Sequence, residues 1–129
     1  MSLESLGKVG EKIALEHYLM NGYKLVAKNF QFYRQGNRGR LGEIDLIMTK
    51  KQVLYLIEVK TRSNSKFGSP VEQISKTKLQ HLYKTYQYFL LKHKLYQNWL
   101  CQFDVASVEG NKVTVFPNAY SFEGLDYTW

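Results

Sequence analysis

Apolar residues recur with the spacing of a helix at the start of the chain. Leu6, Val9, Ile13 and Met20 lie on one side of a helix, and Asn21-Gly22 supplies a stop signal after it. Residues 23–32 are rich in β-formers and predict a strand. A segment of glycine and arginine follows at residues 34–40, with no apolar side chain to bury, and predicts a loop.

Two strongly apolar segments in the middle of the chain predict adjacent strands. They cover residues 43–49 and 53–60 and are joined by a short polar turn at Lys50-Lys51-Gln52. Ser69, Pro70 and Glu72 then have the spacing of a helix N-terminal capping box. The helix that they open has a potential break near Ser75, after which one apolar face continues to about residue 94.

Two further strands are predicted near the end, at residues 101–108 and 112–116, around a turn at residues 109–111. The order is therefore α-β-β-β-α-β-β, which predicts an α/β protein with a central mixed sheet flanked by helices. A length of 129 residues fits a single domain, expected to span residues 1–129. Residues 118–129 form a weakly predictable tail.

Charged residues interrupt the two central strands. Because side chains alternate along a strand, Glu43 and Asp45 are expected to share a face, as are Glu58 and Lys60. A loop of two or four residues would place Asp45 opposite Glu58 and Glu43 opposite Lys60, with Cβ atoms about 4.5–5.5 Å apart. A three-residue loop would instead move one carboxylate to the other face.

Two carboxylates so close in a half-buried sheet repel each other and require compensation. A magnesium ion held by Asp45 and Glu58 would provide it. Such an ion polarises phosphoryl oxygens, and Lys60 beside it could orient or deprotonate an attacking water or neutralise charge on the phosphate. The alternative is a local salt-bridge cluster, with Glu43 bound to Lys60 and Asp45 or Glu58 bound to an arginine.

The charge and composition of the chain indicate which partners it binds and in which cellular compartment it is found. The net charge is +7, and residues 24–94 carry fifteen Lys and Arg against four acids. This distribution favours one positively charged face that binds nucleic acid, although many small proteins are simply basic. The single cysteine, Cys101, excludes an internal disulfide. We expect a cytoplasmic protein without a membrane partner, because no secretory leader or membrane-spanning segment is visible.

An ordered series of short motifs along nearly the whole chain resembles the YraN-like family of uncharacterised bacterial proteins. This family belongs to the PD-(D/E)xK nuclease superfamily and is similar to Holliday-junction resolvases. The matching motifs are Gly10-Glu11 with Ala14, Gly22-Tyr23, Asn29, Gly42-Glu43-Ile44-Asp45-Leu46-Ile47, Glu58-Val59-Lys60-Thr61-Arg62, Phe67-Gly68, Lys78, Phe103-Asp104 and Asn118-Ala119. One departure is Gln102, where an arginine is expected before Phe103-Asp104, which places a phosphate or Asp104 contact in question.

The resemblance implies a restriction-endonuclease-like fold and a Mg²⁺ or Mn²⁺ site. Asp45, Glu58 and the Val59 carbonyl would be metal ligands, Lys60 the catalytic lysine, and Glu11 an accessory ligand or a residue that holds water. Glu43 is either a structural partner of Lys60 or a residue just outside the metal ligands.

Five basic residues are candidates for binding nucleic acid. Arg34, Arg38 and Arg40 lie in the predicted loop and either clamp a phosphate backbone or are simply solvated. Arg62 and Lys78 are expected to contact phosphate.

The favoured function is metal-dependent phosphodiester hydrolysis of DNA by an endonuclease-like protein, with branched or damaged DNA among the substrates considered. The alternatives are a non-catalytic nucleic-acid-binding protein that retains the nuclease fold, and a structural or regulatory protein that binds an acidic partner. The oligomeric state stays open, with a homodimer as one expectation because junction resolvases need two active sites.

Overall fold

The computed structural model describes residues 2–36, 38–62 and 74–122 of the chain. The elements in these ranges are α1 (Leu3–Met20), β1 (Lys24–Tyr33), β2 (Arg40–Lys50), β3 (Val53–Arg62), α2 (Lys76–Lys92), the short 3-10 helix η2 (Lys94–Tyr96), β4 (Leu100–Glu109) and β5 (Lys112–Tyr120). The predicted order α-β-β-β-α-β-β is confirmed.

The five strands form one mixed sheet in the order β1-β2-β3-β4-β5. Neighbouring strands are antiparallel except β3 and β4, which are parallel. A parallel pair needs a crossover connection, and α2 lies within the segment that links β3 to β4. The sheet and its two helices are consistent with the expected restriction-endonuclease-like fold.

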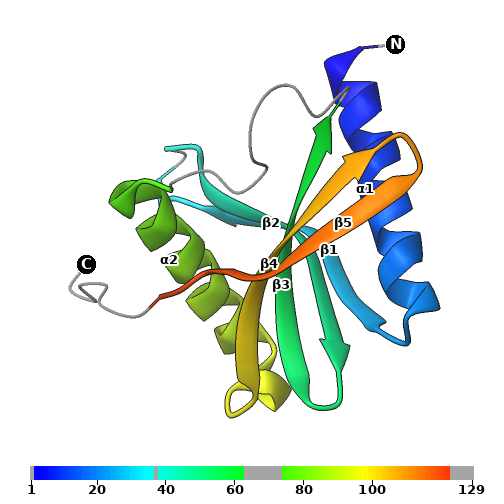
Figure 1. Cartoon of the computed structure of the whole chain (residues 1–129). Helices are drawn as coiled ribbons and strands as arrows, with labels where there is room; N and C mark the ends of the chain where they lie inside the picture. The colour runs from blue at the N-terminus through cyan, green and yellow to red at the C-terminus, as the bar shows by residue number, and fades with distance from the viewer. Residues whose placement is uncertain (1, 37, 63–73, 123–129) are drawn as a thin grey trace.

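The two helices cover opposite faces of the sheet (Figure 1). Ala14 and Tyr18 of α1 pack in a buried cluster with Leu46, Met48, Ile57, Ala106 and Val108. Leu82 and Phe89 of α2 pack in a second cluster with Ile44, Ile47, Leu54, Leu56 and Phe103. Because both faces of the central strands are covered, β2 and β3 are apolar over most of their length, and a charged side chain in them must be accommodated at an opening.

The turn between β2 and β3 has two residues, Lys51 and Gln52, with φ angles of 50° and 62°. Two successive residues with positive φ are typical of a type I′ hairpin turn, whose twist matches that of the strands. A loop with an even number of residues gives the strand register that the sequence analysis expected. The pairs run from Lys50–Val53 to Leu46–Ile57.

Three boundaries differ from expectation. β2 begins at Arg40, so this arginine belongs to the strand and not to the preceding loop. β5 continues to Tyr120, so it includes the first residues of the expected tail. The described helix α2 begins at Lys76, where the Ser75 side chain accepts a hydrogen bond from the Lys78 N–H. The predicted capping box at residues 69–72 lies outside the described residues.

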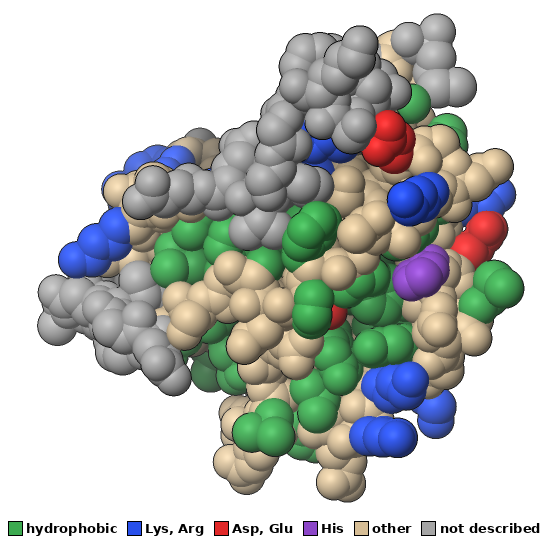
Figure 2. Space-filling view, viewed as in Figure 1, with side chains coloured by type: hydrophobic (Ala, Val, Ile, Leu, Met, Phe, Trp, Pro, Cys, Tyr) green, Lys and Arg blue, Asp and Glu red, His purple; other side chains and the backbone are tan. Residues whose placement is uncertain are grey.

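Figure 2 shows one face of the molecule, seen as in Figure 1 with β4 and β5 toward the viewer. Its described side chains are mainly hydrophobic or uncharged, with lysine and arginine side chains near its margins. This surface is therefore not a uniformly basic face. Within the described ranges, neither helix has the combination of length and hydrophobicity required to cross a membrane.

Candidate metal centre

Strands β2 and β3 separate next to the candidate metal ligands Asp45 and Glu58. Their pairing ends at Leu46–Ile57, one position before Asp45 and Glu58. β2 also changes face here, because Ile44 packs in the cluster under α2 whereas Leu46 packs in the cluster under α1. The expected direct cross-strand pairs, Asp45 with Glu58 and Glu43 with Lys60, are therefore wrong as ladder pairs. Asp45 and Glu58 instead stand at the opening of a fork between the strands.

Asp45 completes the backbone hydrogen bonding at this fork. The Val59 N–H donates to Asp45 Oδ2 at 2.8 Å, in place of a backbone carbonyl of β2. The N–H and C=O of one strand residue point to the same neighbour. The Val59 carbonyl is therefore directed to the open side of β3, toward the same fork as Asp45.

The pKa of the Asp45 carboxyl is raised from 3.8 to about 7. Burial is the largest cause, and the charges of Glu11, Glu43 and Glu58 raise it further, whereas the hydrogen bond from Val59 lowers it. Among the described residues, the charged groups that shift the Asp45 pKa are therefore all carboxylates. A cation bound at this position would lower the pKa and favour the ionised form.

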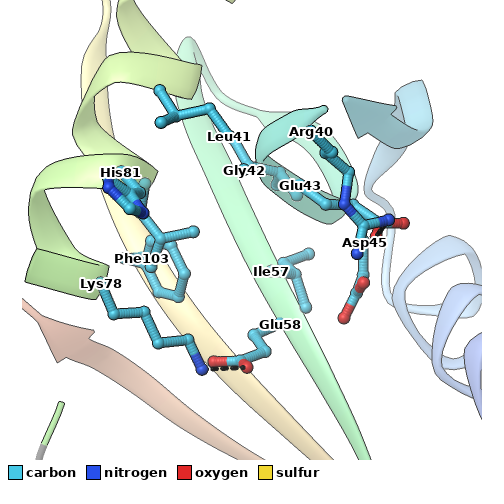
Figure 3. A pocket seen from close by; sticks show the side chains of 12 residues that line it. Arg40, Leu41, Gly42, Glu43, Asp45, Ile57, Glu58, Lys78, His81 and Phe103 are labelled. Atoms are coloured by element: carbon cyan, nitrogen blue, oxygen red, sulfur yellow. Dashed lines mark hydrogen bonds and ion pairs between the residues drawn. The ribbon is translucent and has the colours of Figure 1, made fainter. Parts of the chain in front are cut away.

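Glu58 supplies the second carboxylate and lines the same pocket as Asp45 (Figure 3). Its Oε1 lies 3.6 Å from Lys78 Nζ, and its side chain is 22% exposed. Among the described residues, the buried Oε2 atom has no hydrogen-bond partner. An ionised carboxylate oxygen without a partner is costly, and a bound cation would satisfy it.

Lys60 lies on the same face of β3 as Glu58, because β3 pairs with β4 in regular register throughout. It is half-buried and is not among the side chains that line the pocket. Glu43, its expected partner, instead accepts a 2.7 Å hydrogen bond from Arg40 Nη1. Glu43 is thus paired with Arg40, three residues before it on the same strand, and not with Lys60, and Glu58 is paired with Lys78 and not with an arginine, so the described ion pairs differ from those of the salt-bridge alternative.

Asn29 joins two of the carboxylates, a role that the sequence analysis missed. With its amide oriented to donate, its Nδ2 lies 3.1 Å from Glu11 Oε2 and 3.2 Å from Glu43 Oε1. Asn29 has a φ of 53°, a left-handed conformation that asparagine tolerates better than most residues. The sequence did not predict this φ angle. The presence of Asn29 among the motifs shared with the family was the one indication that this residue has a role.

Glu11 is brought near Asp45 from the α1 side, since its charge raises the Asp45 pKa. Burial raises the pKa of Glu11 itself, partly offset by the Asn29 hydrogen bond. Glu11 does not line the pocket that contains Asp45 and Glu58. Its role as an accessory ligand stays a prediction.

The five candidate nucleic-acid-binding residues fall into two groups. Arg40 and Lys78 line opposite walls of the pocket, and each is engaged by a carboxylate. Arg34, Arg38 and Arg62 do not line it. Arg34 and Arg38 are exposed beside the turn closed by the Arg34 N–H···O=C Gly39 hydrogen bond of 2.9 Å, and Arg62 ends β3.

Gln102, where the family resemblance led us to expect arginine, contacts Asp104. Its Nε2 donates to Asp104 Oδ1 at 2.8 Å. The Asn118 N–H donates to the same oxygen at 3.0 Å, and the Tyr18 hydroxyl to Oδ2 at 3.3 Å. Asp104 is only 1% exposed, so this set links α1, β4 and β5 and is structural.

The donor set fits a hard divalent cation. Mg²⁺ is commonly bound by one or two carboxylates while the remaining positions are left to water and phosphate. Asp45, Glu58 and the Val59 carbonyl supply oxygen atoms of this kind, and the unpaired Glu58 Oε2 is the atom that most needs a cation. In the described parts of the chain, no group of three or more His, Cys, Asp or Glu side chains is arranged to hold a metal.

Comparison with known proteins places these features in a family. The model of the uncharacterised protein family UPF0102 matches residues 10–108. A UPF0102 protein of Legionella pneumophila strain Corby is 37% identical over 116 residues, which cover 88% of this chain and 92% of the relative. The UPF0102 proteins of Caldicellulosiruptor bescii and Persephonella marina are 35% and 32% identical, covering 84% and 94% of this chain and 85% and 95% of theirs. The matched residues contain Glu11, Asp45, Glu58 and Lys60, and the chain belongs to the UPF0102 family, the YraN family that its motifs resemble.

Proposed function

We propose that this protein is a metal-dependent phosphodiester hydrolase that acts on DNA as an endonuclease. The observation that carries the proposal is that the two carboxylates at the fork, Asp45 and Glu58, are only partly compensated by their partners. Asp45 has a pKa raised to about 7, and among described residues the buried Glu58 Oε2 has no hydrogen-bond partner. Perturbed titratable groups in a pocket are typical of functional sites. A purely structural salt-bridge cluster would have paired Glu58 Oε2 as well as Oε1.

Asp45, Glu58 and the Val59 carbonyl are the ligands in this proposal. Mg²⁺ or Mn²⁺ held by these atoms would polarise a phosphoryl oxygen of the substrate and lower the pKa of a bound water. The Val59 N–H holds the Asp45 carboxylate in place through a hydrogen bond to Oδ2. Lys78 and Arg40, on the pocket walls, neutralise substrate phosphates.

Lys60 acts on the reacting phosphate or on the water. It orients or deprotonates the attacking water, or it offsets the negative charge on the phosphoryl oxygens as the water attacks and the bond to the leaving oxygen breaks. Its place on the same face as Glu58 supports this role. Glu11, on the α1 side of Asp45, is assigned the task of holding water at the edge of the site.

The test is a cleavage assay with Mg²⁺ or Mn²⁺ on linear, nicked, flapped and four-way DNA. Lys60→Ala should nearly abolish cleavage while DNA affinity stays close to that of the wild type, because Lys60 acts mainly on the transition state. Arg38→Ala is the control, since this exposed arginine lies outside the pocket. It should weaken binding and leave the single-turnover rate of bound DNA unchanged.

Two results would contradict the proposal. Protein that binds DNA but cleaves none of the four forms with either metal is a binding module that retains the fold. A trace cleavage activity that survives Lys60→Ala undiminished comes from a contaminant.

A further inference from the structure

Asn29 lies on β1 at the position across from Asp45. The strand register pairs the residue before Asn29 with Leu46 and the residue after it with Ile44. Asn29 therefore falls opposite the candidate metal ligand, at the point where β2 changes from one face of the sheet to the other. Its φ of 53° is left-handed, a conformation that few residues other than glycine adopt. Both strands are thus irregular at the same level of the sheet.

The Asn29 side chain contacts two carboxylates that come from different elements. With its amide oriented to donate, its Nδ2 lies 3.1 Å from Glu11 Oε2 on α1 and 3.2 Å from Glu43 Oε1 on β2. An amide nitrogen carries two hydrogens, so it donates to both oxygens at once. Two like charges repel, and a shared donor between them allows the two carboxylates to stay close.

One of these carboxylates is also held independently of Asn29. Glu43 Oε2 accepts a 2.7 Å hydrogen bond from Arg40 Nη1, whereas its Oε1 faces Asn29. In Figure 3, Arg40 and Glu43 lie on the opposite side of the pocket from Lys78. Because the arginine fixes Glu43, the amide of Asn29 has an anchored partner, and its second hydrogen is directed to Glu11.

Glu11 is the carboxylate that this arrangement brings to Asp45. Of the three acids whose charges raise the Asp45 pKa, Glu11 has the largest effect. The preceding residue, Gly10, permits a close approach of α1 to β3, because a Cβ there would overlap the Thr61 side chain. The helix packing therefore sets the position of the Glu11 backbone, and the Asn29 amide sets the direction of its side chain.

The geometry points to Asn29 as a positioning residue of the candidate metal centre, whose amide holds the Glu11 carboxylate beside Asp45. This inference rests on the proposed function, in which Glu11 holds water at the edge of the site, and it adds a residue that the proposed function does not use. Asn29 touches neither the metal nor the substrate. Mg²⁺ usually keeps several of its waters, so an acid that holds one of them favours the bound ion.

Calorimetric titration of Asn29→Gly with Mn²⁺ tests this role. Glycine adopts the left-handed conformation without strain, so the substitution removes the amide and keeps the backbone of β1. We expect the Kd for Mn²⁺ to rise by about fivefold to tenfold, near the lower end of the effect typical of residues that orient metal ligands. Circular dichroism and urea denaturation confirm that the variant folds.

Asn118→Gly is the matched control. Asn118 also has a φ of 53°, is exposed, and lies on β5 at the other edge of the sheet. Its hydrogen bond to Asp104 is made by the backbone N–H, which glycine retains. Asn118→Gly should therefore leave the Kd for Mn²⁺ unchanged.

A double-mutant cycle with Glu11→Gln shows whether Asn29 acts through Glu11. Glu11→Gln should itself raise the Kd for Mn²⁺ by about fivefold to tenfold, because it removes the charge that holds the water. In that background, Asn29→Gly should raise the Kd by at most about twofold more, since the residue that it positions is already neutral. A merely structural role of Asn29 would give the same factor in both backgrounds.

Four results overturn the inference: an unchanged Kd for Mn²⁺ in folded Asn29→Gly, an unchanged Kd in Glu11→Gln, equal weakening by the two glycine variants, and independent effects of Asn29→Gly and Glu11→Gln. If one of them occurs while the wild type binds Mn²⁺ and cleaves DNA, the proposed function stands without this role of Asn29. A wild type that binds no Mn²⁺ and cleaves no DNA contradicts both.

Discussion

The Val59 N–H donates to the Asp45 side chain at 2.8 Å, at the position where β2 leaves β3. A side chain thereby takes the place of the backbone acceptor that the ladder no longer supplies. This bond holds the Asp45 carboxylate next to Val59. Beyond it, the segment of β3 that carries Glu58 and Lys60 is no longer paired with β2. The candidate site thus depends on where the pairing of two strands stops.

The raised pKa of Asp45 makes stability depend on pH in the metal-free protein. The pKa of Asp45 is about 7 in the folded protein and 3.8 for an unperturbed carboxyl. Between about pH 4 and pH 7 the folded state therefore binds more protons than the unfolded state. The free energy of unfolding should therefore fall as pH rises from about 4 to about 7. Asp45→Asn should remove this fall and raise the free energy of unfolding at pH 8 by about 1–2 kcal/mol, less than the full shift allows because the group is partly solvated.

Urea denaturation at pH 4 and pH 8 in EDTA measures this effect. Glu109→Gln is the control, since Glu109 is exposed at the end of β4. The account of the Asp45 environment fails if Asp45→Asn and the wild type have the same stability at pH 8.

Much of the fold was predictable because its signals are local. The helix spacing around Ala14, the β-rich central segments and the short turn at Lys51 and Gln52 each act over a few residues. The even turn also predicted the strand register. The fold class followed from the order of these elements.

The details of the site were less predictable because they depend on contacts between distant residues. Nothing in the sequence pattern shows that pairing ends after Leu46, since that depends on Asp45 replacing a backbone acceptor. The link from Asn29 to Glu11 joins β1 to α1 through a left-handed residue. The pairing of Lys78 with Glu58 requires α2 to lie over β3. Each of these arises only once the layers are packed.

The close approach of α1 to β3 provides a second prediction. A Cβ on Gly10 would overlap the Thr61 side chain, so Gly10→Ala requires either that side chain or the helix to shift. We expect a loss of about 1–3 kcal/mol of stability, typical of overpacking. Thr61→Ala removes the obstructing atoms, and the double variant should recover most of the loss in a double-mutant cycle followed by urea denaturation. Additive effects of the two substitutions would contradict this contact.

Lys78 and the proposed metal ion would compete for Glu58. Its Nζ lies 3.6 Å from Glu58 Oε1 and its side chain is 58% exposed, so the pair is weak. Lys78→Met should tighten Mn²⁺ binding by about two- to tenfold, on the order of 1 kcal/mol, and weaken DNA binding. Lys76→Met is the matched control, because Lys76 begins the same helix, is exposed and does not line the pocket. Equal Mn²⁺ affinities for both variants would show that Lys78 does not oppose the metal.

The central claim is that Asp45 and Glu58 together hold one divalent cation, and calorimetric titration with Mn²⁺ tests it most directly. The wild type should bind one ion per chain. Asp45→Asn and Glu58→Gln should each weaken binding at least tenfold, because each removes one of two charged ligands. Lys60→Ala should retain the site, since this lysine is not a ligand. A folded Asp45→Asn/Glu58→Gln double variant that binds Mn²⁺ as tightly as the wild type would contradict the account, as would a wild-type protein that binds no Mn²⁺.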